Sequence, residues 1–478
     1  MKSLLIRIIL ILTVGEIAYL ALVNLALNLP LTQSLVNQHR PEKYAVYWER
    51  AWSWYPFRVH VRGLSVNGQT RSQQWQADTP VASASVAVLP LFRRTVQVDD
   101  VAAEDLAFRL RPRPKPDKDY AATRGFFPPI RDRDPDSPAA SRKPRKPGTG
   151  WRIVVDGARA RGHHEFWVFQ VRGAADGDLR ATLTYQTRGG PVSVSGGEAD
   201  LALRHLTVNK DWEVSSGGAV KGVFELAPFV PAENPGLKAL GFLTVDAELD
   251  AAVESLGFLD FYLRRVNGMA MDGKGQLRGH LHYEQGNLVH GTDLKVSADR
   301  LALSVPPYQV AGSGGIAIRM SPDQPETLGI DILFDALEAL HRGDQVPLFT
   351  GQGLRVVAQG TARVLPDAAR ERGQGRLALS IPSVQVPDLR VYQRYLPDRW
   401  NLELKGGQGS LQGQAQFSAS DLSAQLNLVS DDAHLRFKDF RFETNLDLGL
   451  KVTGDASGSA NVDLSGTYLR LDQARLAS

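Results

Sequence analysis

Histidine and carboxylate side chains that could bind a metal ion or transfer a proton gather at two places in this sequence. His163, His164 and Glu165 are consecutive, and neighbouring strand residues point to opposite faces, so these side chains would chelate poorly. His280 and His282 share a strand face, but no Cys or close carboxylate completes a ligand set. Both groups are interpreted as solvated strand residues, and we expect no metal site and no cofactor.

The sequence carries no pattern for nucleophilic or nucleotide chemistry. It has no GxSxG, HExxH or GxxxxGK[ST] motif, and the GxGxxxG spacing of Gly273–Gly279 differs from the dinucleotide fingerprint. The 478 residues include no cysteine, which excludes a thiol nucleophile and a disulfide framework. The net charge of +3 argues against nucleic acid as a partner, because nucleic-acid binders carry a strong basic excess. We therefore expect a protein that is not an enzyme.

The N-terminus predicts a membrane anchor over residues 1–35. The 22 residues of Ile8–Leu29 are almost wholly apolar, and such a helix is about 33 Å long, enough to cross a bilayer core of about 30 Å. Lys2 and Arg7 precede the apolar run, so the positive-inside rule places the N-terminus in the cytoplasm and the bulk of the chain outside it. The run is long for a cleaved signal peptide, and we expect an uncleaved, single-pass anchor.

Polar residues inside this anchor need an explanation. The anchor residues are Ile8 and Leu29 at its ends, with Glu16 and Asn24 between them. An ionisable group in a span costs about 2.5–3.5 kcal/mol on insertion scales for comparable charges. Glu16 is interpreted either as a contact with a second transmembrane helix, assisted by Asn24 and Asn28, or as a protonated acid that the bilayer tolerates.

Residues 36–57 are predicted to form a juxtamembrane helix with an aromatic face. Tyr44, Trp48, Trp52 and Tyr55 recur at near-helical spacing. Tyr and Trp rings are enriched at the membrane interface, where one end of the ring is apolar and the other is wet. These residues are interpreted as an interfacial belt, or as the face of a helix that caps the first β layer.

Strand patterns start at residue 58 and are interrupted once. Residues 58–110 are predicted to form a first β section. Residues 111–150 hold 9 of the 27 prolines and carry a net charge of +6, from 11 Lys and Arg against 5 Asp. A segment of this composition cannot bury enough apolar surface to order itself, so it is predicted to be a disordered basic insert. The insert is either solvated or in contact with an anionic surface.

Apolar and polar residues alternate through residues 151–478, as in Leu446–Leu450. Successive strand side chains point to opposite faces, so each strand has one apolar and one polar face. Turn-forming pairs such as Asn67-Gly68, Gly196-Gly197 and Gly217-Gly218 come every 10 to 15 positions and predict an antiparallel meander. Short helices are expected near three segments, which are 255–265, 335–342 and 387–396.

The predicted fold class is mostly β: a transmembrane helix, then a long curled antiparallel sheet with a few short helices. The sheet must cover its apolar face, either by packing on another layer or by curling into a trough that shelters an apolar guest. The residues expected to line such a groove share the apolar parity of their strands, and they are Leu243, Val245, Leu249, Leu277, Leu281, Leu294, Val296, Leu411, Leu426, Leu428, Leu446, Leu448 and Leu450.

An internal repeat supports this architecture. The segment Gly273–Gly279 (GKGQLRG) returns as Gly407–Gly413 (GQGSLQG), and the two repeat units lie near 255–320 and 387–452. Repeats of this kind extend a sheet by stacking similar units. The glycines share the parity of the apolar residues, so they either let the sheet curl inward or leave room for a guest.

Four passages carry a resemblance to a known family. The N-terminal anchor, WYPFRVHVRGLSVNG, VLPLFRRTVQVDDVAAEDLAFRLRP and the two glycine-rich repeats resemble the AsmA-like envelope proteins of Gram-negative bacteria, in the TamB, YhdP and YdbH branch. The resemblance implies a trough-shaped periplasmic sheet, called a β-taco, that is anchored in the inner membrane and carries phospholipid toward the outer membrane.

We therefore expect a single-pass inner-membrane protein whose bulk lies in the periplasm and whose partner is phospholipid. A partner protein in the inner membrane or the outer membrane is also expected. Two alternatives remain: an assembly factor that helps outer-membrane β-proteins fold by strand addition, and a structural scaffold that binds envelope glycan.

Overall fold

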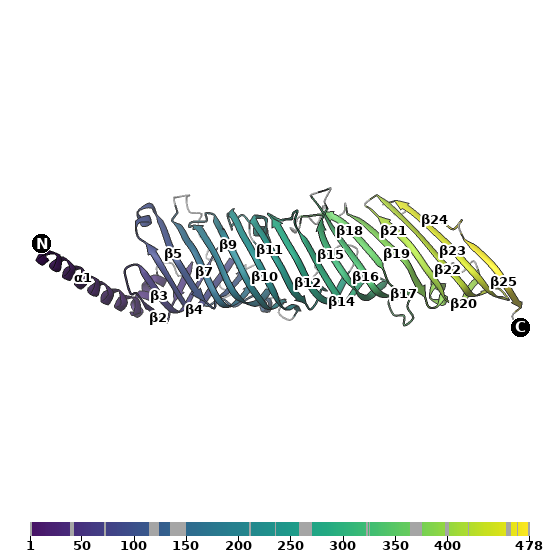
Figure 1. Cartoon of the computed structure of the whole chain (residues 1–478), viewed down its shortest axis with the longest axis horizontal. Helices are drawn as coiled ribbons and strands as arrows, with labels where there is room; N and C mark the ends of the chain where they lie inside the picture. The colour runs from purple at the N-terminus through teal and green to yellow at the C-terminus, as the bar shows by residue number, and fades with distance from the viewer. Residues whose placement is uncertain are drawn as a thin grey trace. The chain divides into compact units, whose positions relative to one another are not determined.

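The structure, a computed structural model, divides into two compact units. Unit 1 comprises Met1–Ala251 and His282–Gly286, and unit 2 comprises Ala252–Leu281 and Asn287–Ser478. The fold is mostly β with an apolar N-terminal helix and a few short helices, which confirms the predicted fold class (Figure 1). The residues that the structure describes are 2–38, 43–70, 73–113, 124–133, 150–209, 212–234, 236–257, 270–321, 324, 326–363, 375–396, 401–418, 420–455, 460–465 and 467–476.

Two helices open unit 1. Helix α1 (Lys2–Asn28) consists mainly of Leu, Ile, Val and Ala, and α2 (Pro30–Gln38) follows it. Proline lacks an N–H and has a fixed φ, so Pro30 breaks the first helix and suits the first position of the second. The stretch Leu10–Asn28 is long and apolar enough to cross a membrane, and none of it is buried within the protein.

The strands of unit 1 form a mixed sheet. They are β1 (Tyr44–Tyr47), β2 (Arg50–Trp52), β3 (Arg58–Gln69), β4 (Gln73–Ala87), β5 (Thr95–Glu104), β6 (Ala107–Pro112), β7 (Arg152–Val168), β8 (Val171–Gln186), β9 (Val192–Val208), β10 (Trp212–Phe229) and β11 (Leu243–Val253). Most neighbours are antiparallel, but β5 and β6 pair with β7 in parallel. Parallel strands need a long crossover connection, and here the connection contains the predicted insert.

The predicted aromatic helix of residues 36–57 is wrong. Strands β1 and β2 occupy this segment and pair antiparallel with β3, so Tyr44 and Trp52 lie in strands. The backbone hydrogen bonds to β3 outweigh the near-helical spacing of the aromatic residues, because buried backbone groups must find partners.

The predicted disorder of the insert is wrong for residues 124–133, which pack against β4. Ile130 is only 6 % exposed, and the Arg111 guanidinium donates to the carbonyl oxygens of Pro128 and Arg133 at 3.2 and 2.6 Å. Polar side chains of β4 supply further partners, since the Arg131 N–H donates to a Gln76 side-chain oxygen at 2.7 Å. Composition does not reveal such long-range hydrogen bonds. The rest of the insert, 114–123 and 134–149, lies outside the described residues.

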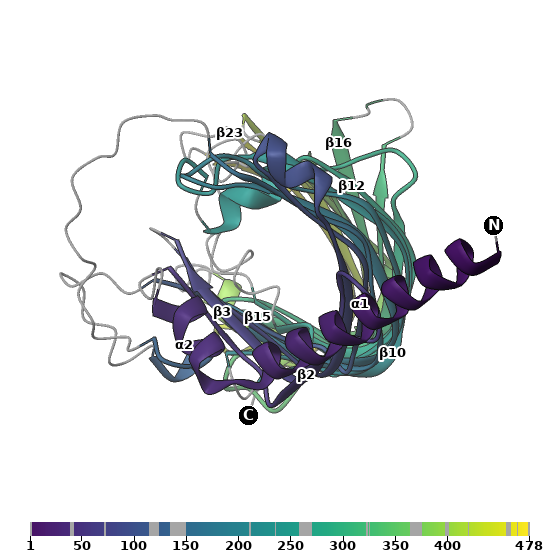
Figure 2. The ribbon, with the colours of Figure 1, turned by 90° about the vertical axis from the view of Figure 1, so that its left-hand side faces the viewer.

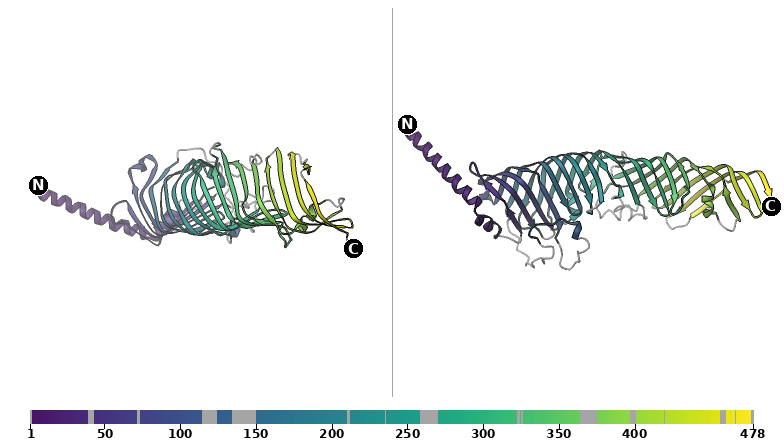
Figure 3. Two further views of the ribbon diagram at one scale, coloured as in Figure 1. Left: turned by 45° about the vertical axis from the view of Figure 1, so that its right-hand side comes forward. Right: turned by 90° about the horizontal axis from the view of Figure 1, so that it is seen from below.

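Unit 2 continues the alternating pattern. Its strands are β12 (Ala270–Glu284), β13 (Asn287–Leu288), β14 (Asp293–Val305), β15 (Tyr308–Met320), β16 (Thr327–His341), β17 (Phe349–Gly351), β18 (Leu354–Thr361), β19 (Arg376–Val386), β20 (Leu402–Gly406), β21 (Gly409–Phe417), β22 (Asp421–Phe437), β23 (Phe440–Asp455), β24 (Ala460–Asp463) and β25 (Tyr468–Leu476). Figure 3 shows them side by side in two further views.

The three short helices expected from the sequence have different outcomes. Helix η6 (Leu389–Tyr395) is a 3₁₀ helix, so the prediction near 387–396 is confirmed. The segment 335–342 is the end of strand β16 instead, where Leu337 and Ala339 pair with β15. The segment 255–265 lies mostly outside the described residues.

Candidate functional site: the apolar inner faces

In unit 2, the strand register aligns apolar side chains on one face, which we call the inner face. Leu277 pairs with Val296, and Val296 pairs with Ile316 on the next strand. Ile316 in turn pairs with Ile332, which pairs with Val356. Side chains of paired residues share a face, so this row is one continuous apolar stripe.

The same face continues through β21, β22 and β23. Leu411 pairs with Leu428, which pairs with Leu448. Two residues along each strand, Leu426 pairs with Leu450. Of the residues predicted to line a groove, those of unit 2 all have inner-face parity in their strands, and they are Leu277, Leu281, Leu294, Val296, Leu411, Leu426, Leu428, Leu446, Leu448 and Leu450.

Exposure varies along the inner face of unit 2. Leu301 and Phe334 are fully buried near the middle of their strands, where they join the apolar cluster of the unit. Inner-face residues at strand ends remain open, as Val305 is 39 % exposed and Phe417 is 40 % exposed. Helix η6 covers part of this face, since Leu389 is fully buried in the same cluster. The face is therefore closed in its middle and open at its margins.

The inner face of unit 1 is more open. Leu201 on β9 pairs with Gly177 on one side and Val220 on the other, and both Leu201 and Val220 are half-buried. Leu183 on β8 is 38 % exposed and pairs with Val194 on β9. Aliphatic side chains thus line this face without being sealed from solvent, whereas a packed core would bury them almost completely.

The predicted groove residues of unit 1 lie on β11. Leu243, Val245 and Leu249 are half-buried and share their face with the buried Ala247 and Ala251. The 3₁₀ helix η3 (Gly236–Phe242) lies just before this strand. It carries Phe242, which stacks on Phe229 of β10 with ring centroids 5.2 Å apart. Burial raises the pKa of the Tyr185 hydroxyl, also on the inner face, which indicates an apolar environment there.

A row of bulges and glycines bends the strands in the middle. The register shifts at Gly275 on β12 and at Gly314 on β15, and similar shifts recur on other pairs of long strands, such as β9 with β10 and β22 with β23. A Cβ at Gly314 would overlap the Leu333 carbonyl oxygen of the next strand, and one at Gly275 would overlap that of Ser297. Glycine therefore permits the close backbone approach of a bend, which favours the curling interpretation of these residues (Figure 2).

We call this row of bulges and glycines the crease. Three of the turns predicted from the sequence are wrong, because their glycines lie inside strands. Gly196-Gly197 and Gly217-Gly218 lie inside β9 and β10, which have 17 and 18 residues, and Asn67-Gly68 lies inside β3. Gly218 has a φ of 154°, and a Cβ there would overlap the backbone of the neighbouring strand. Glycine pairs in this chain mark bends within long strands more often than turns between short ones.

The outer face carries charged residues that pair across strands. Arg355 donates to both carboxylate oxygens of Asp331 at 2.8 and 2.5 Å, and Arg319 donates to Asp293 at 2.9 Å. The hydrogen bonds from Arg355 lower the pKa of the Asp331 carboxyl. Each strand thus separates a charged outer face from an apolar inner face.

His163 and His282 each lie beside one carboxylate. His163 contacts Asp176 at 2.9 Å, whereas His164 points to the other face and is 4 % exposed. Among the residues that the structure describes, no group of three His, Cys, Asp or Glu side chains is placed to hold a metal ion. His282 Nε2 lies 3.2 Å from the Glu284 carboxylate.

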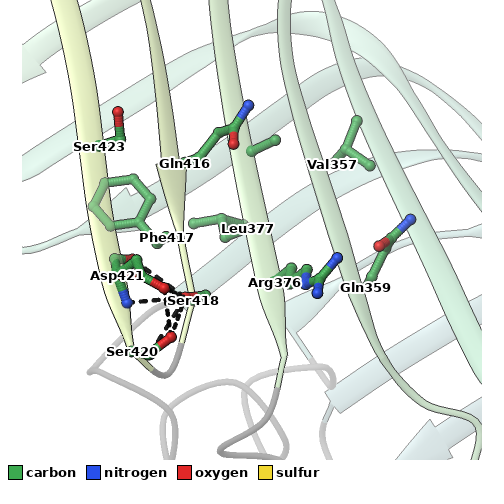
Figure 4. Close-up of a pocket in the computed structure, with 11 residues that line it drawn as sticks. Val357, Gln359, Arg376, Leu377, Gln416, Phe417, Ser418, Ser420, Asp421 and Ser423 are labelled. Carbon is green, nitrogen blue, oxygen red and sulfur yellow. Dashed lines mark hydrogen bonds between the residues drawn. The ribbon is translucent and has the colours of Figure 1, made fainter. Parts of the chain in front are cut away.

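A hollow of about 540 Å³ lies where β18, β19, β21 and β22 end (Figure 4). Three of its polar residues bond to one another, since the Asp421 N–H donates to Ser418 Oγ at 2.9 Å and Ser420 Oγ donates to the Asp421 carboxylate at 2.5 Å. These bonds are those of a side-chain-supported turn. Arg376 and Phe417 also line it. The hollow is a feature of the strand ends rather than a formed ligand site.

Two asparagines of α1 contact the first edge of the sheet. Asn24 Nδ2 donates to the Ser53 carbonyl oxygen at 2.9 Å, and the Ser53 N–H donates back to Asn24 Oδ1 at 2.8 Å. Asn28 makes the same exchange with Ala51 at 2.7 and 3.3 Å. Within this chain both asparagine amides therefore bind the sheet edge, and a contact of α1 with a second transmembrane helix stays a prediction. Glu16 is exposed, and Leu29 is 43 % exposed; the side chain of Ile8 lies outside the described residues.

Two amides of α2 complete this edge. Gln33 Nε2 donates to the Trp48 carbonyl oxygen at 2.6 Å, and Asn37 exchanges two hydrogen bonds with Val46 at 3.0 and 2.8 Å. The four amides follow one another along one side of α1 and α2, and they occupy backbone groups that an edge strand leaves unpaired. We call this set the amide ladder. In the sequence, only the spacing of Asn24, Asn28, Gln33 and Asn37 points to this contact.

The predicted interface aromatics divide into packed and exposed residues. Trp48 is half-buried and donates to the Leu27 carbonyl oxygen at 2.9 Å, and Trp52 stacks on His60 with ring centroids 5.6 Å apart. Tyr44 is half-buried in β1, whereas Tyr55 is 47 % exposed. The segment therefore packs on the sheet edge and exposes an aromatic residue at its end.

Comparisons with protein-family models, with curated proteins and with solved structures find no match to this chain.

Proposed function

We propose that this protein is anchored in the bacterial inner membrane by α1 and shelters lipid acyl chains on its inner faces, for phospholipid transfer toward the outer membrane. The observation that carries the proposal is the inner face of unit 1, where aliphatic side chains such as Leu201 and Leu183 stay half-exposed. Such a face is unfavourable in water unless something apolar covers it.

The energetic scale fits an acyl chain. Each methylene removed from water contributes about 0.8 kcal/mol, so a 16-carbon chain in water is unfavourable by about 13 kcal/mol. A face lined by Leu, Val and Ala removes much of this cost, and the charged outer face keeps the protein soluble. The exposed apolar α1 fits the same proposal, because the bilayer is the source of the lipid.

The proposal is tested by photo-crosslinking at residues of opposite parity. A photoreactive amino acid replaces Leu201 or its outer-face neighbour Asp200 in unit 1, and Leu426 or Gln425 in unit 2, in the full chain expressed in a Gram-negative host. We expect phospholipid adducts at Leu201 and Leu426 and none at Asp200 and Gln425. Because each pair differs by one position in the same strand, the two members report on opposite faces at the same place in the sheet, and the outer-face member is the more exposed of the two.

Three other outcomes would overturn the proposal. Lipid adducts at both parities would show non-specific contact with membrane, and no lipid adducts at either parity would exclude an acyl-chain site. Crosslinks to unfolded outer-membrane proteins in place of lipid would favour the assembly-factor alternative. Mass spectrometry of lipids extracted from the purified protein gives an independent measurement of whether phospholipid is bound.

A further inference from the structure

The end of unit 1 beside α1 exposes an unusual concentration of apolar side chains. Trp54 is 69 % exposed and Phe57 is 53 % exposed in the turn between β2 and β3. The 3₁₀ helix η1 (Leu89–Arg93) joins β4 to β5, and within it Leu89 is 81 % exposed and Phe92 is 86 % exposed. Exposed apolar patches of this kind mark interaction sites rather than ordinary surface.

These two segments lie together. The Val86 N–H donates to the Phe57 carbonyl oxygen at 2.9 Å, and Arg58 pairs with Ser85, so the turn and η1 leave the same end of the β3–β4 pair. We call Trp54, Tyr55, Phe57, Leu89 and Phe92 the apolar tip.

The backbone supports a role for this surface beyond folding. Phe57 has a φ of 66°, a left-handed conformation that costs a bulky residue strain and that Gly or Asn adopts more readily. Residues in such strained conformations concentrate at functional sites. Here the strained residue carries a ring that is half-exposed rather than packed in a core.

The contact between the apolar tip and α1 sets its position relative to a membrane. The Phe57 ring lies 6.4 Å from the Tyr19 ring of α1, centroid to centroid. The amide ladder holds Asn24 and Asn28 of the same helix beside β2. Tyr19 precedes Asn24 by five residues, or about 7.5 Å of helix. The apolar tip therefore lies farther along α1 toward its N-terminus than the first sheet edge does.

Basic residues border the apolar tip. Arg58 lies beside Tyr55, with its Nη1 2.8 Å from the tyrosine oxygen, and Arg93 and Arg94 end η1. Apolar side chains flanked by Arg suit a phospholipid bilayer, because the rings enter the lipid and the long Arg side chains can reach toward phosphate.

We propose that the apolar tip inserts into the same bilayer that α1 crosses, as a second membrane contact that holds the open face of unit 1 at the lipid surface. The occupant is phospholipid bilayer, because the tip adjoins the transmembrane helix and carries the charges that lipid phosphates complement. The inference rests on the membrane anchoring of α1 and goes beyond it, since a single transmembrane helix can tilt in the bilayer together with the sheet that is attached to it.

The test uses the absence of native cysteine. Leu89→Cys and Phe92→Cys are compared with Val223→Cys, an exposed apolar position (52 %) in β10, in the full chain reconstituted in nanodiscs of phosphatidylethanolamine and phosphatidylglycerol. The rate of reaction with a membrane-impermeant maleimide is normalised to that of the same variant in SDS. We expect rates at Leu89→Cys and Phe92→Cys at least about tenfold below that at Val223→Cys, because burial of such side chains in lipid excludes the reagent.

A second measurement makes the result independent of cysteine reactivity. A fluorophore attached at position 92 is quenched by brominated phospholipids if the apolar tip is inserted, and one at position 223 is not. Equal maleimide rates at the three positions together with no quenching, in protein that still floats with lipid in a density gradient, would overturn this inference and leave the anchor intact. Protein that fails to float would overturn the anchor itself and, with it, the proposed function.

Discussion

The amide ladder predicts that two asparagines of the anchor helix hold the first edge of the sheet in place. Replacement of Asn24 and Asn28 by Ala removes four hydrogen bonds, with lengths of 2.9, 2.8, 2.7 and 3.3 Å, to the backbone of Ser53 and Ala51. Each bond contributes about 0.5–1.5 kcal/mol, so the double variant loses about 2–6 kcal/mol of edge stability. Ala51 and Ser53 are only 2 % and 3 % exposed, so water cannot easily replace the lost partners.

The assay is hydrogen exchange of the peptide that contains Ala51 and Ser53, in full-length protein in nanodiscs. A loss of 2 kcal/mol corresponds to exchange about 30-fold faster for the amides of both residues, because each 1.4 kcal/mol is a factor of ten. Gln38→Ala is the matched control, since Gln38 is an α2 amide that bonds to Ser34 of its own helix. Unchanged exchange in the double variant, equal to that of the control, would refute the role of the ladder.

Three further predictions follow from the crease, the ordered part of the insert and the outer face. Gly314→Ala should lower the free energy of unfolding by about 1–3 kcal/mol, because the new Cβ would overlap the Leu333 carbonyl oxygen. Gly360 has open space around it, so Gly360→Ala should change the free energy of unfolding by less than about 0.5 kcal/mol. Equal denaturation midpoints for the two variants would contradict the bend. Arg111→Met removes the guanidinium that holds the carbonyls of Pro128 and Arg133, so limited trypsin digestion should cleave after Arg131, and continued resistance would show that this segment is held by other contacts. Arg355 lowers the folded-state pKa of Asp331, so the pair stabilises the protein fully above the unfolded pKa of about 3.9. This contribution is lost as the pH falls through the lower folded pKa. Asp331→Asn should therefore reduce the difference in denaturation midpoint between pH 6 and pH 3, and an unchanged difference would argue against this pair.

Strand parity was the most reliable information in the sequence. Side chains alternate strictly along a strand, so Leu446, Leu448 and Leu450 had to share a face wherever the strand began or ended. The register then brings Leu448 opposite Leu428 and Leu450 opposite Leu426. Parity alone predicted these residues on one face because it depends on the backbone geometry of a single strand and on no distant contact.

Strand length and the first sheet edge could not be predicted in the same way. Glycine pairs such as Gly217-Gly218 favour turns and bends alike, and only the neighbouring strand, whose backbone approaches closely, selects the bend. The aromatic spacing of Tyr44 to Tyr55 matches a helix, but the partners of the backbone are β3 and the amides of α1 and α2. Both errors concern hydrogen bonds between residues far apart in the chain, which local patterns do not record.

The repeat shows a similar limit. Leu277 pairs with Val296. In an exact repeat, its counterpart Leu411 would pair with residue 430, but it pairs with Leu428, two residues earlier. A shift of two residues leaves every side chain on its original face, because the strand period is two. Similar sequences can therefore keep the same apolar face while their hairpins differ in register.

The crease also bears on how such a protein can change in size. Several long strands of unit 2, such as β14, β15 and β16, contribute their own bend through a glycine or a bulge. Duplication of a hairpin, of the kind that GKGQLRG and GQGSLQG suggest, would then add length along one direction while the profile across the strands stayed the same. Evolution could adjust the length of the sheet by whole hairpins, and the bend of the strands would be inherited with each copy.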